Sequence, residues 1–242
     1  MRVTWGSQRG DPSELALRLR LVVDPDGGRG ADPIVAASWG TFSLWAGGVN
    51  VTAYSDGQES HEEITWYLLP LLEQVAEHWD PLLHEERLPC RVAGVDAAIS
   101  LASTAFPPGS ADDGWERDWQ SWWGRHALQA PPSGRPIPDV VIRRWREQLE
   151  VSGRRVAPAG GPYEVRFLAT DGHARCDATR AADVIHEVCL EAVTQLRRMH
   201  PDSIRLSELQ ERYEALRSAP VAPRLTWLAG LGDRSDEVME AV

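Results

Sequence analysis

The hydrophobic period of this sequence changes from two residues to about 3.6 residues between positions 15–23 and positions 59–83. In the first stretch every second residue from Leu15 to Leu21 is leucine, which is typical of a strand with one buried face. In the second stretch apolar residues recur at helical spacing: Ile64, Tyr67, Leu68, Leu71, Leu72, Val75 and Trp79. Because both elements must bury an apolar face, we expect an α+β fold, with a mainly antiparallel sheet packed against several α-helices.

Turn residues mark the boundaries of the N-terminal strands. Residues 25–33 are rich in Gly, Asp and Arg and should form a loop, and residues 35–45 should form a second extended stretch. Gly47-Gly48 follows, and glycine readily reaches the positive φ angles that a tight hairpin needs. The sheet is therefore expected to begin as an antiparallel meander.

The helix expected over residues 59–83 carries its own start signal. Ser60 is a suitable N-cap, and Glu63 lies three residues later, where a capping-box partner is found. Pro70 lacks an amide hydrogen, so we expect the helix to kink or break there.

The remaining elements follow from the same patterns. We expect a strand over residues 163–169 and helices over residues 95–104, 112–128, 177–199 and 206–216. Residues 130–138 are rich in proline and should form a loop. Residues 138–152 favour a hairpin that turns near residues 146–148, and a short helix over residues 139–150 is the alternative. We expect residues 1–218 to form a single α+β domain, with a helical C-terminal part at about 177–217, and residues 219–242 to form a linker and a short tail.

Composition suggests the compartment and disfavours one class of partner. The formal net charge is −11, which opposes general binding to nucleic acid. All 25 basic residues are arginine, which we attribute to a bacterial genome rich in G and C. Three cysteines do not make a disulfide framework, and we see neither a signal peptide nor a transmembrane segment, so we expect a cytoplasmic protein that does not bind a membrane.

The sequence contains no complete catalytic or metal-binding motif. A zinc-protease helix needs a second histidine four residues after the first, but Thr65, Leu88 and Leu190 stand at the three places where a His-Glu pair would require it. The sequence has no nucleophile elbow and no phosphate-binding glycine loop. The residues His173, Cys176, His186 and Cys189 could form a metal site, although Cys189 lies on an apolar helical stripe and we favour a core cysteine. We therefore expect no catalytic residue, no metal and no cofactor.

Tryptophan and arginine are the residues that point to a partner. The chain has 11 tryptophans, and Trp115, Trp119, Trp122 and Trp123 share one predicted helix, where most should pack in the core. Exposed tryptophan and arginine are enriched at protein–protein hot spots. We expect the partner-binding residues to be Trp79, Trp123, Trp145, Arg143, Arg144 and Arg146.

Several phrases resemble a known family. They are Trp39-Gly40-x-Phe42-x-Leu44-Trp45, Gly48-x-Asn50, the segments 66–73 and 77–89, Arg125-His126-Ala127-Leu128 and Pro138-Asp139. Together they resemble the N-terminal accessory region of actinobacterial metallo-endopeptidases of the IrrE type (ImmA/IrrE), over roughly residues 35–200. In that family a separate His-Glu-x-x-His segment binds the catalytic zinc, and this chain contains none. The resemblance implies recognition or regulation and not peptide hydrolysis.

These observations favour a non-enzymatic protein-recognition or assembly subunit of a bacterial complex, in stress response or in defence against phage. The first alternative is a nucleic-acid-binding subunit that uses Arg143, Arg144 and Arg146 with the interleaved Trp145. The second alternative is an enzyme whose site is assembled from scattered residues such as His84, Glu85, Glu86 and Asp113.

Overall fold

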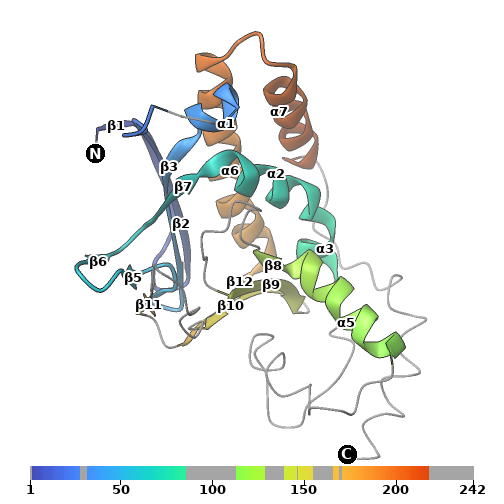
Figure 1. Cartoon of the computed structure of the whole chain (residues 1–242). Coiled ribbons are helices and arrows are strands. Elements are labelled where there is room, and N and C mark those ends of the chain that lie inside the picture. The colour runs from blue at the N-terminus through green and yellow to red at the C-terminus, as the bar shows by residue number, and fades with distance from the viewer. Residues whose placement is uncertain are drawn as a thin grey trace, which may run out of the picture.

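The computed structural model describes residues 2–27, 32–85, 113–128, 139–145, 147–154, 166–168 and 171–217 (Figure 1). The strands in these ranges are β1 (Val3–Gly10), β2 (Leu15–Val22), β3 (Trp39–Ala46), β4 (Val49–Asn50), β5 (Tyr54–Ser55), β6 (Ser60–His61), β7 (Ile64–Tyr67), β8 (Ala127–Leu128), β9 (Asp139–Trp145), β10 (Gln148–Arg154), β11 (Arg166–Phe167) and β12 (Asp171–Asp177). The helices are α1 (Pro33–Ala37), α2 (Leu68–Glu77), α3 (Trp79–His84), α5 (Asp113–His126), α6 (Ala178–Met199) and α7 (Ile204–Arg217). Antiparallel sheets together with helices confirm the expected α+β class.

The first sheet has the order β1-β2-β3-β4, and β7 also pairs with β3. All of its pairings are antiparallel. The expected hairpin at Gly47-Gly48 is confirmed, since both glycines have positive φ and Trp45 pairs with Asn50 across the turn. The meander predicted from the sequence is therefore present.

A second sheet has the order β12-β10-β9-β8, and a small third sheet has the order β11-β5-β6. The hairpin expected over residues 138–152 is confirmed, because Trp145 of β9 pairs with Gln148 of β10. The alternative of a short helix over residues 139–150 is wrong.

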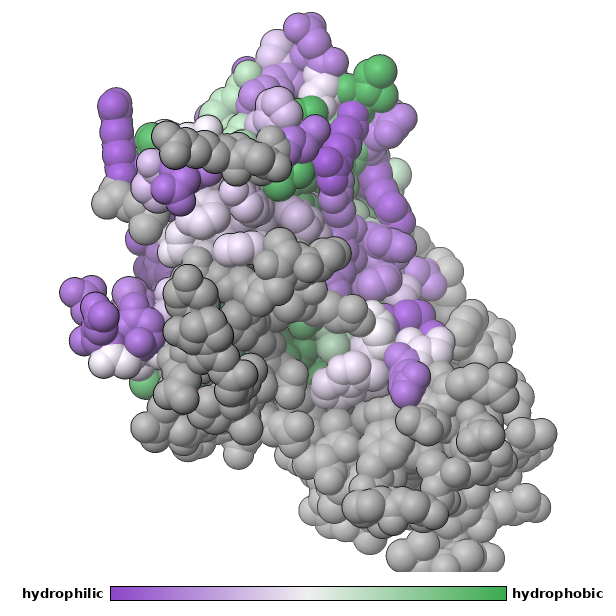
Figure 2. All heavy atoms as spheres, viewed as in Figure 1, coloured by the Kyte–Doolittle hydropathy of each residue, from purple (hydrophilic) through white to green (hydrophobic). Residues whose placement is uncertain are grey.

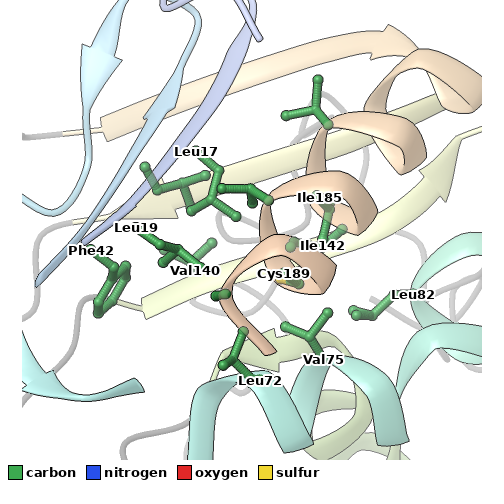
Figure 3. Packing of buried hydrophobic residues seen from close by; sticks show 14 of the residues in the cluster. Leu17, Leu19, Phe42, Leu72, Val75, Leu82, Val140, Ile142, Ile185 and Cys189 are labelled. Atoms are coloured by element: carbon green, nitrogen blue, oxygen red, sulfur yellow. The ribbon is translucent and has the colours of Figure 1, made fainter. Parts of the chain in front are cut away.

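Helix α6 forms the centre of the core. Asp177 caps it by accepting a hydrogen bond from the Arg180 amide, so the helix predicted over residues 177–199 is confirmed. Its buried stripe packs against Leu17 and Leu19 of the first sheet and against Val140 and Ile142 of the second, with residues of α2 and α3 on a further side (Figure 3). One cluster of buried residues thus joins both large sheets to the helices.

Helix α7 closes the core from the C-terminal side. The Tyr213 hydroxyl donates to the Leu72 carbonyl of α2 at 2.7 Å, and both groups are buried. Arg205 forms a bidentate ion pair with Glu73 at 2.5 and 2.7 Å. These contacts bind the last described helix to the first half of the chain.

Two features of the N-terminal part differ from what the sequence led us to expect. Strand β1 was not expected, because its alternating residues are mostly polar or small. Residues 35–37, expected to be extended, lie in α1, since Asp32 caps the Ile34 amide and Pro33 takes the first helical position.

The helix expected over residues 59–83 begins later than predicted. Residues 60–67 hold β6 and β7, where Ile64 and its aromatic and β-branched neighbours favour a strand, so Ser60 is not an N-cap. Helix α2 is capped instead by Ser38, whose carbonyl and hydroxyl oxygens accept from the amides of Leu68 and Leu69 at 2.8 and 3.1 Å. Pro70 lies in the first turn, where no amide hydrogen is needed, and the break falls at His78 between α2 and α3.

The other predictions concern helices, loops and the surface. The helices expected over residues 112–128 and 206–216 correspond to α5 and α7. The helix expected over residues 95–104, the loop over residues 130–138 and the tail over residues 219–242 lie outside the described residues.

Figure 2 shows that hydrophilic residues predominate on the described part of the viewed face. Among the described helices, none is both long enough and apolar enough to cross a bilayer.

Candidate functional site

The polar face of the second sheet brings together charged residues from three strands. Strand β10 lies between β9 and β12, and Glu150 at its centre pairs with Arg143 on one side and with Arg175 on the other. Residues directly opposite each other in a sheet project to the same face. The two guanidinium groups therefore flank one carboxylate.

Glu150 accepts most of its contacts on one oxygen. Its Oε2 lies 2.9 Å from Arg143 Nη2 and 3.2 Å from both Nε and Nη2 of Arg175. The Nε2 of His173 is 3.8 Å away. Glu150 is 0% exposed and Arg143 only 2%, so this ion pair is held out of water, where geometry and pairing decide whether it is tolerated.

Trp145 completes the site as an aromatic surface. The guanidinium carbons of Arg143 and Arg175 lie 4.7 and 4.1 Å from the centre of its ring. Both distances fall within the range of a cation–π interaction. Trp145 and Arg175 are half-buried and His173 is exposed, so these three residues form the accessible rim above the buried Glu150. We call Trp145, Arg175 and His173 the Trp145 platform.

Glu150 also restrains the positions of the side chains at the platform. Ion pairing restrains both guanidinium groups, and stacking restrains the indole, so the groups are arranged before any partner arrives. Such a surface can accept a carboxylate through Arg175 and can cover an apolar or aromatic group with Trp145.

Only part of the expected partner-binding set reaches this surface. Arg144 faces away from Arg143, is 1% exposed and ion-pairs with Glu147 at 3.0 Å, so the patch expected from neighbouring arginines is split between two faces. Trp79 is 5% exposed and packs edge-on against His186, so it is a core residue and not an exposed anchor. Trp123 on α5 is half-buried, and Arg146 lies outside the described residues.

Sequence reasoning missed Arg175 and Glu150, and it considered His173 only as a possible metal ligand. Strand β12 lacks the β-branched and aromatic residues that usually indicate a strand. A signal was present, because Ala174 and Cys176 alternate with His173 and Arg175. That alternation has the strand period and would have placed the two basic side chains on one face.

A second buried charged cluster joins α3 to α5. Glu85, just after α3, is held by Arg125 at 2.8 and 3.2 Å, and His126 Nε2 lies 3.7 Å from its carboxylate. The imidazole stacks on Trp122 with 4.0 Å between ring centres, and its Nδ1 lies 2.8 Å from the Trp122 carbonyl oxygen. Burial lowers the pKa of His126 to about 3, which outweighs the effect of that carbonyl. The imidazole is therefore neutral at pH 7.

This cluster bears on the alternative of a scattered enzyme site. His84 and Glu85 are both buried, and Arg125 contacts both oxygens of Glu85. Glu86 and the side chain of Asp113 lie outside the described residues. The described part of the cluster therefore shows a connection between two helices.

A metal site formed by His173, Cys176, His186 and Cys189 would require the two His-Cys pairs to lie close together. Burial raises the pKa of the Cys176 thiol to about 11 and that of the Cys189 thiol to about 12, so both stay protonated at pH 7. His186 Nε2 is 2.7 Å from the Tyr213 carbonyl oxygen. Over the ranges that the structure describes, no three His, Cys, Asp or Glu residues are arranged to hold a metal ion.

A similar arrangement occurs on the outer face of the first sheet. Glu63 pairs with Arg18 at 2.5 Å and with Arg20 at 3.2 Å, and it accepts from the Thr41 hydroxyl at 2.6 Å. The Arg18 guanidinium lies 5.0 Å from the ring centre of Trp45. Both large sheets thus restrain two arginines with one glutamate beside a tryptophan.

Known proteins give no further guidance to the site. Neither a protein-family model, nor a curated protein, nor a solved structure matches this chain. The resemblance to the accessory region of IrrE-type proteins therefore stays a prediction.

Proposed function

We propose that this protein is a recognition subunit that binds a segment of a partner protein on the Trp145 platform. The observation that carries the proposal is the pairing of Arg143 and Arg175 with one buried carboxylate beside a half-exposed indole. Tryptophan and arginine are among the residues most enriched at binding hot spots, and restrained side chains lose less entropy when they bind.

The charge of the rim indicates the chemistry of the partner. Arg175 lies beside Trp145 and His173 lies beside Glu150 on the same face of the sheet, and the side chains of Arg175 and His173 are accessible. An acidic segment that carries an apolar or aromatic residue would match both the basic side chains and the indole ring of this surface. The net charge of −11 would repel a highly acidic partner. We therefore expect only a short acidic segment of the partner to bind at this surface.

The test compares affinity capture by variants from a lysate of the organism that makes the protein, with quantitative mass spectrometry. Trp145→Ala and His173→Ala should each lose at least one protein that the wild type retains, by about 30-fold for a hot-spot residue. Trp45→Ala is the matched control, since Trp45 also stacks with an arginine but belongs to the other sheet. Unfolding curves first establish that all variants fold. Identical capture by wild type and by the two platform variants would refute the proposal.

Nucleic-acid binding is the second candidate, because stacked arginine and tryptophan are also found where single strands bind. Quenching of tryptophan fluorescence by a single-stranded oligonucleotide tests it. Binding that weakens steeply with salt and is lost in Arg175→Gln would replace the protein partner by nucleic acid. Arg144→Glu is unsuitable for this purpose, because Arg144 is buried.

A further inference from the structure

Strand β1 forms an outer edge of the first sheet. Within the described ranges it pairs with β2 only. Its residues are exposed or half-buried throughout. An edge strand presents unpaired amide and carbonyl groups that can bond to a further strand.

This edge has little of the protection that natural edges carry. Lysine, proline, bulges and inward-pointing charges usually guard such strands. Residues 3–10 contain neither lysine nor proline, and the one register irregularity lies between Val3 and Trp5, at the start. Arg9 supplies a charge, but Glu187 and Glu191 of α6 pair with it. Residues from Trp5 to Gly10 therefore form a regular edge with its one charge compensated.

The ends of β1 carry opposite charges. Arg2 precedes the strand, and its carbonyl oxygen accepts from the Val23 amide at 3.1 Å, which fixes Arg2 beside the sheet. Asp11 follows the strand, and its carboxylate accepts from the amide and the hydroxyl of Ser13 at 2.8 Å each. Both side chains are exposed. A strand that is positive at its start and negative at its end is complementary to an antiparallel copy of itself.

We propose that two copies of this chain associate through β1, antiparallel about a two-fold axis, so that their first sheets become continuous. Arg2 of each copy then lies near Asp11 of the other, whereas a parallel arrangement would bring like charges together. The α6 helices of both copies lie on the same face when the axis passes through Ser7. In that register Trp5 is opposite the partner's Arg9, which suits a cation–π contact across the new pair of strands.

The test uses the full chain and two measurements together. Sedimentation equilibrium from micromolar to sub-millimolar concentration should show a monomer–dimer equilibrium. Hydrogen exchange should show protection of residues 3–10 that rises with concentration, whereas peptides from α7 stay unchanged. A monomer at every concentration would overturn the proposal, and so would a dimer in which exchange of β1 does not slow.

Charge variants test the orientation. Arg2→Glu should weaken the dimer roughly 2- to 30-fold at low ionic strength, because repulsion replaces attraction at both ends of the pair, and salt should reduce the effect. Arg212→Glu is the control, since Arg212 is an exposed residue on α7. Equal weakening by both variants would mean that total charge governs association, and the antiparallel arrangement would then be wrong.

Discussion

The substitution Glu150→Gln tests whether the buried carboxylate holds the polar face of the second sheet together. Arg143 is 2% exposed, so after the substitution its guanidinium keeps its charge in a place that water does not reach. Removing one member of a buried ion pair costs about 3–5 kcal/mol. Arg175 can reach water and adds little to that cost, since its side chain is 22% exposed.

The assay is equilibrium unfolding in urea, followed by far-ultraviolet circular dichroism. A loss of about 3–5 kcal/mol in the free energy of unfolding corresponds to a fall in Tm of roughly 6–20 °C for a chain of this size. Glu73→Gln is the matched control, because Glu73 also pairs with an arginine, Arg205, but the two side chains are 32% and 44% exposed. We expect less than about 1 kcal/mol from that change.

A double substitution distinguishes the cost of the unpaired charge from the cost of changing the shape of the site. Arg143→Met combined with Glu150→Leu removes both charges of the buried pair and should recover much of the lost stability, because uncharged residues of similar volume need no partner. A Glu150→Gln protein that unfolds within about 1 kcal/mol of the wild type would refute the reasoning, since the guanidinium groups would then not depend on Glu150.

Three further predictions concern other parts of the chain. Gly40→Ala should lower the free energy of unfolding by about 1–3 kcal/mol or more in urea titrations, because an added Cβ would lie 2.2 Å from the Arg20 carbonyl oxygen. Stability measured by thermal unfolding should fall as the pH drops from about 6.5 toward 3, since the unfolded chain protonates His126 and the folded chain does not, and His126→Phe should remove that part of the loss. Native Cys176 and Cys189 should resist a thiol reagent at pH 8 and react after unfolding, and stability should fall above pH 9, where the unfolded thiols ionise first.

Each of these predictions has a control. Gly27 has positive φ with no atom near an added Cβ, so Gly27→Ala measures backbone strain without a clash. A His126→Phe protein with the same acid dependence as the wild type would show that other groups cause it. The labelling uses a Cys90→Ser background, and rapid reaction of the native protein would contradict the burial of both thiols.

The sequence correctly predicts elements in which apolar residues recur at a regular spacing or in which a capping or turn residue marks the boundary. Helix α6 combines an apolar stripe with Asp177 as its cap, and the hairpin at Gly47-Gly48 has the glycines that its φ angles need. Helix α2 was placed too early, because its first turn is capped by Ser38, which is 30 residues away from Leu68 in sequence. Local pattern cannot identify a cap that tertiary packing supplies.

The candidate site was predicted less completely than the fold. Trp145 and Arg143 stand out in the sequence, and the strand puts both on one face and Arg144 on the other. Glu150 and Arg175 join them only because β10 lies between β9 and β12. Strand order is a property of the whole fold, so residues 25 positions apart could not be assigned to one ion pair from their neighbours in sequence.

The position of α6 has a consequence for folding during synthesis. This helix covers the apolar face of β2, yet more than 150 residues separate the end of β2 at Val22 from the start of α6 at Ala178. A ribosome that adds about 5–20 residues per second needs roughly 9–35 s to translate the chain from β2 to the end of α6. During that interval the leucines of β2 lack their helical cover, so the nascent N-terminal half would be a natural substrate for a chaperone that shields apolar strands.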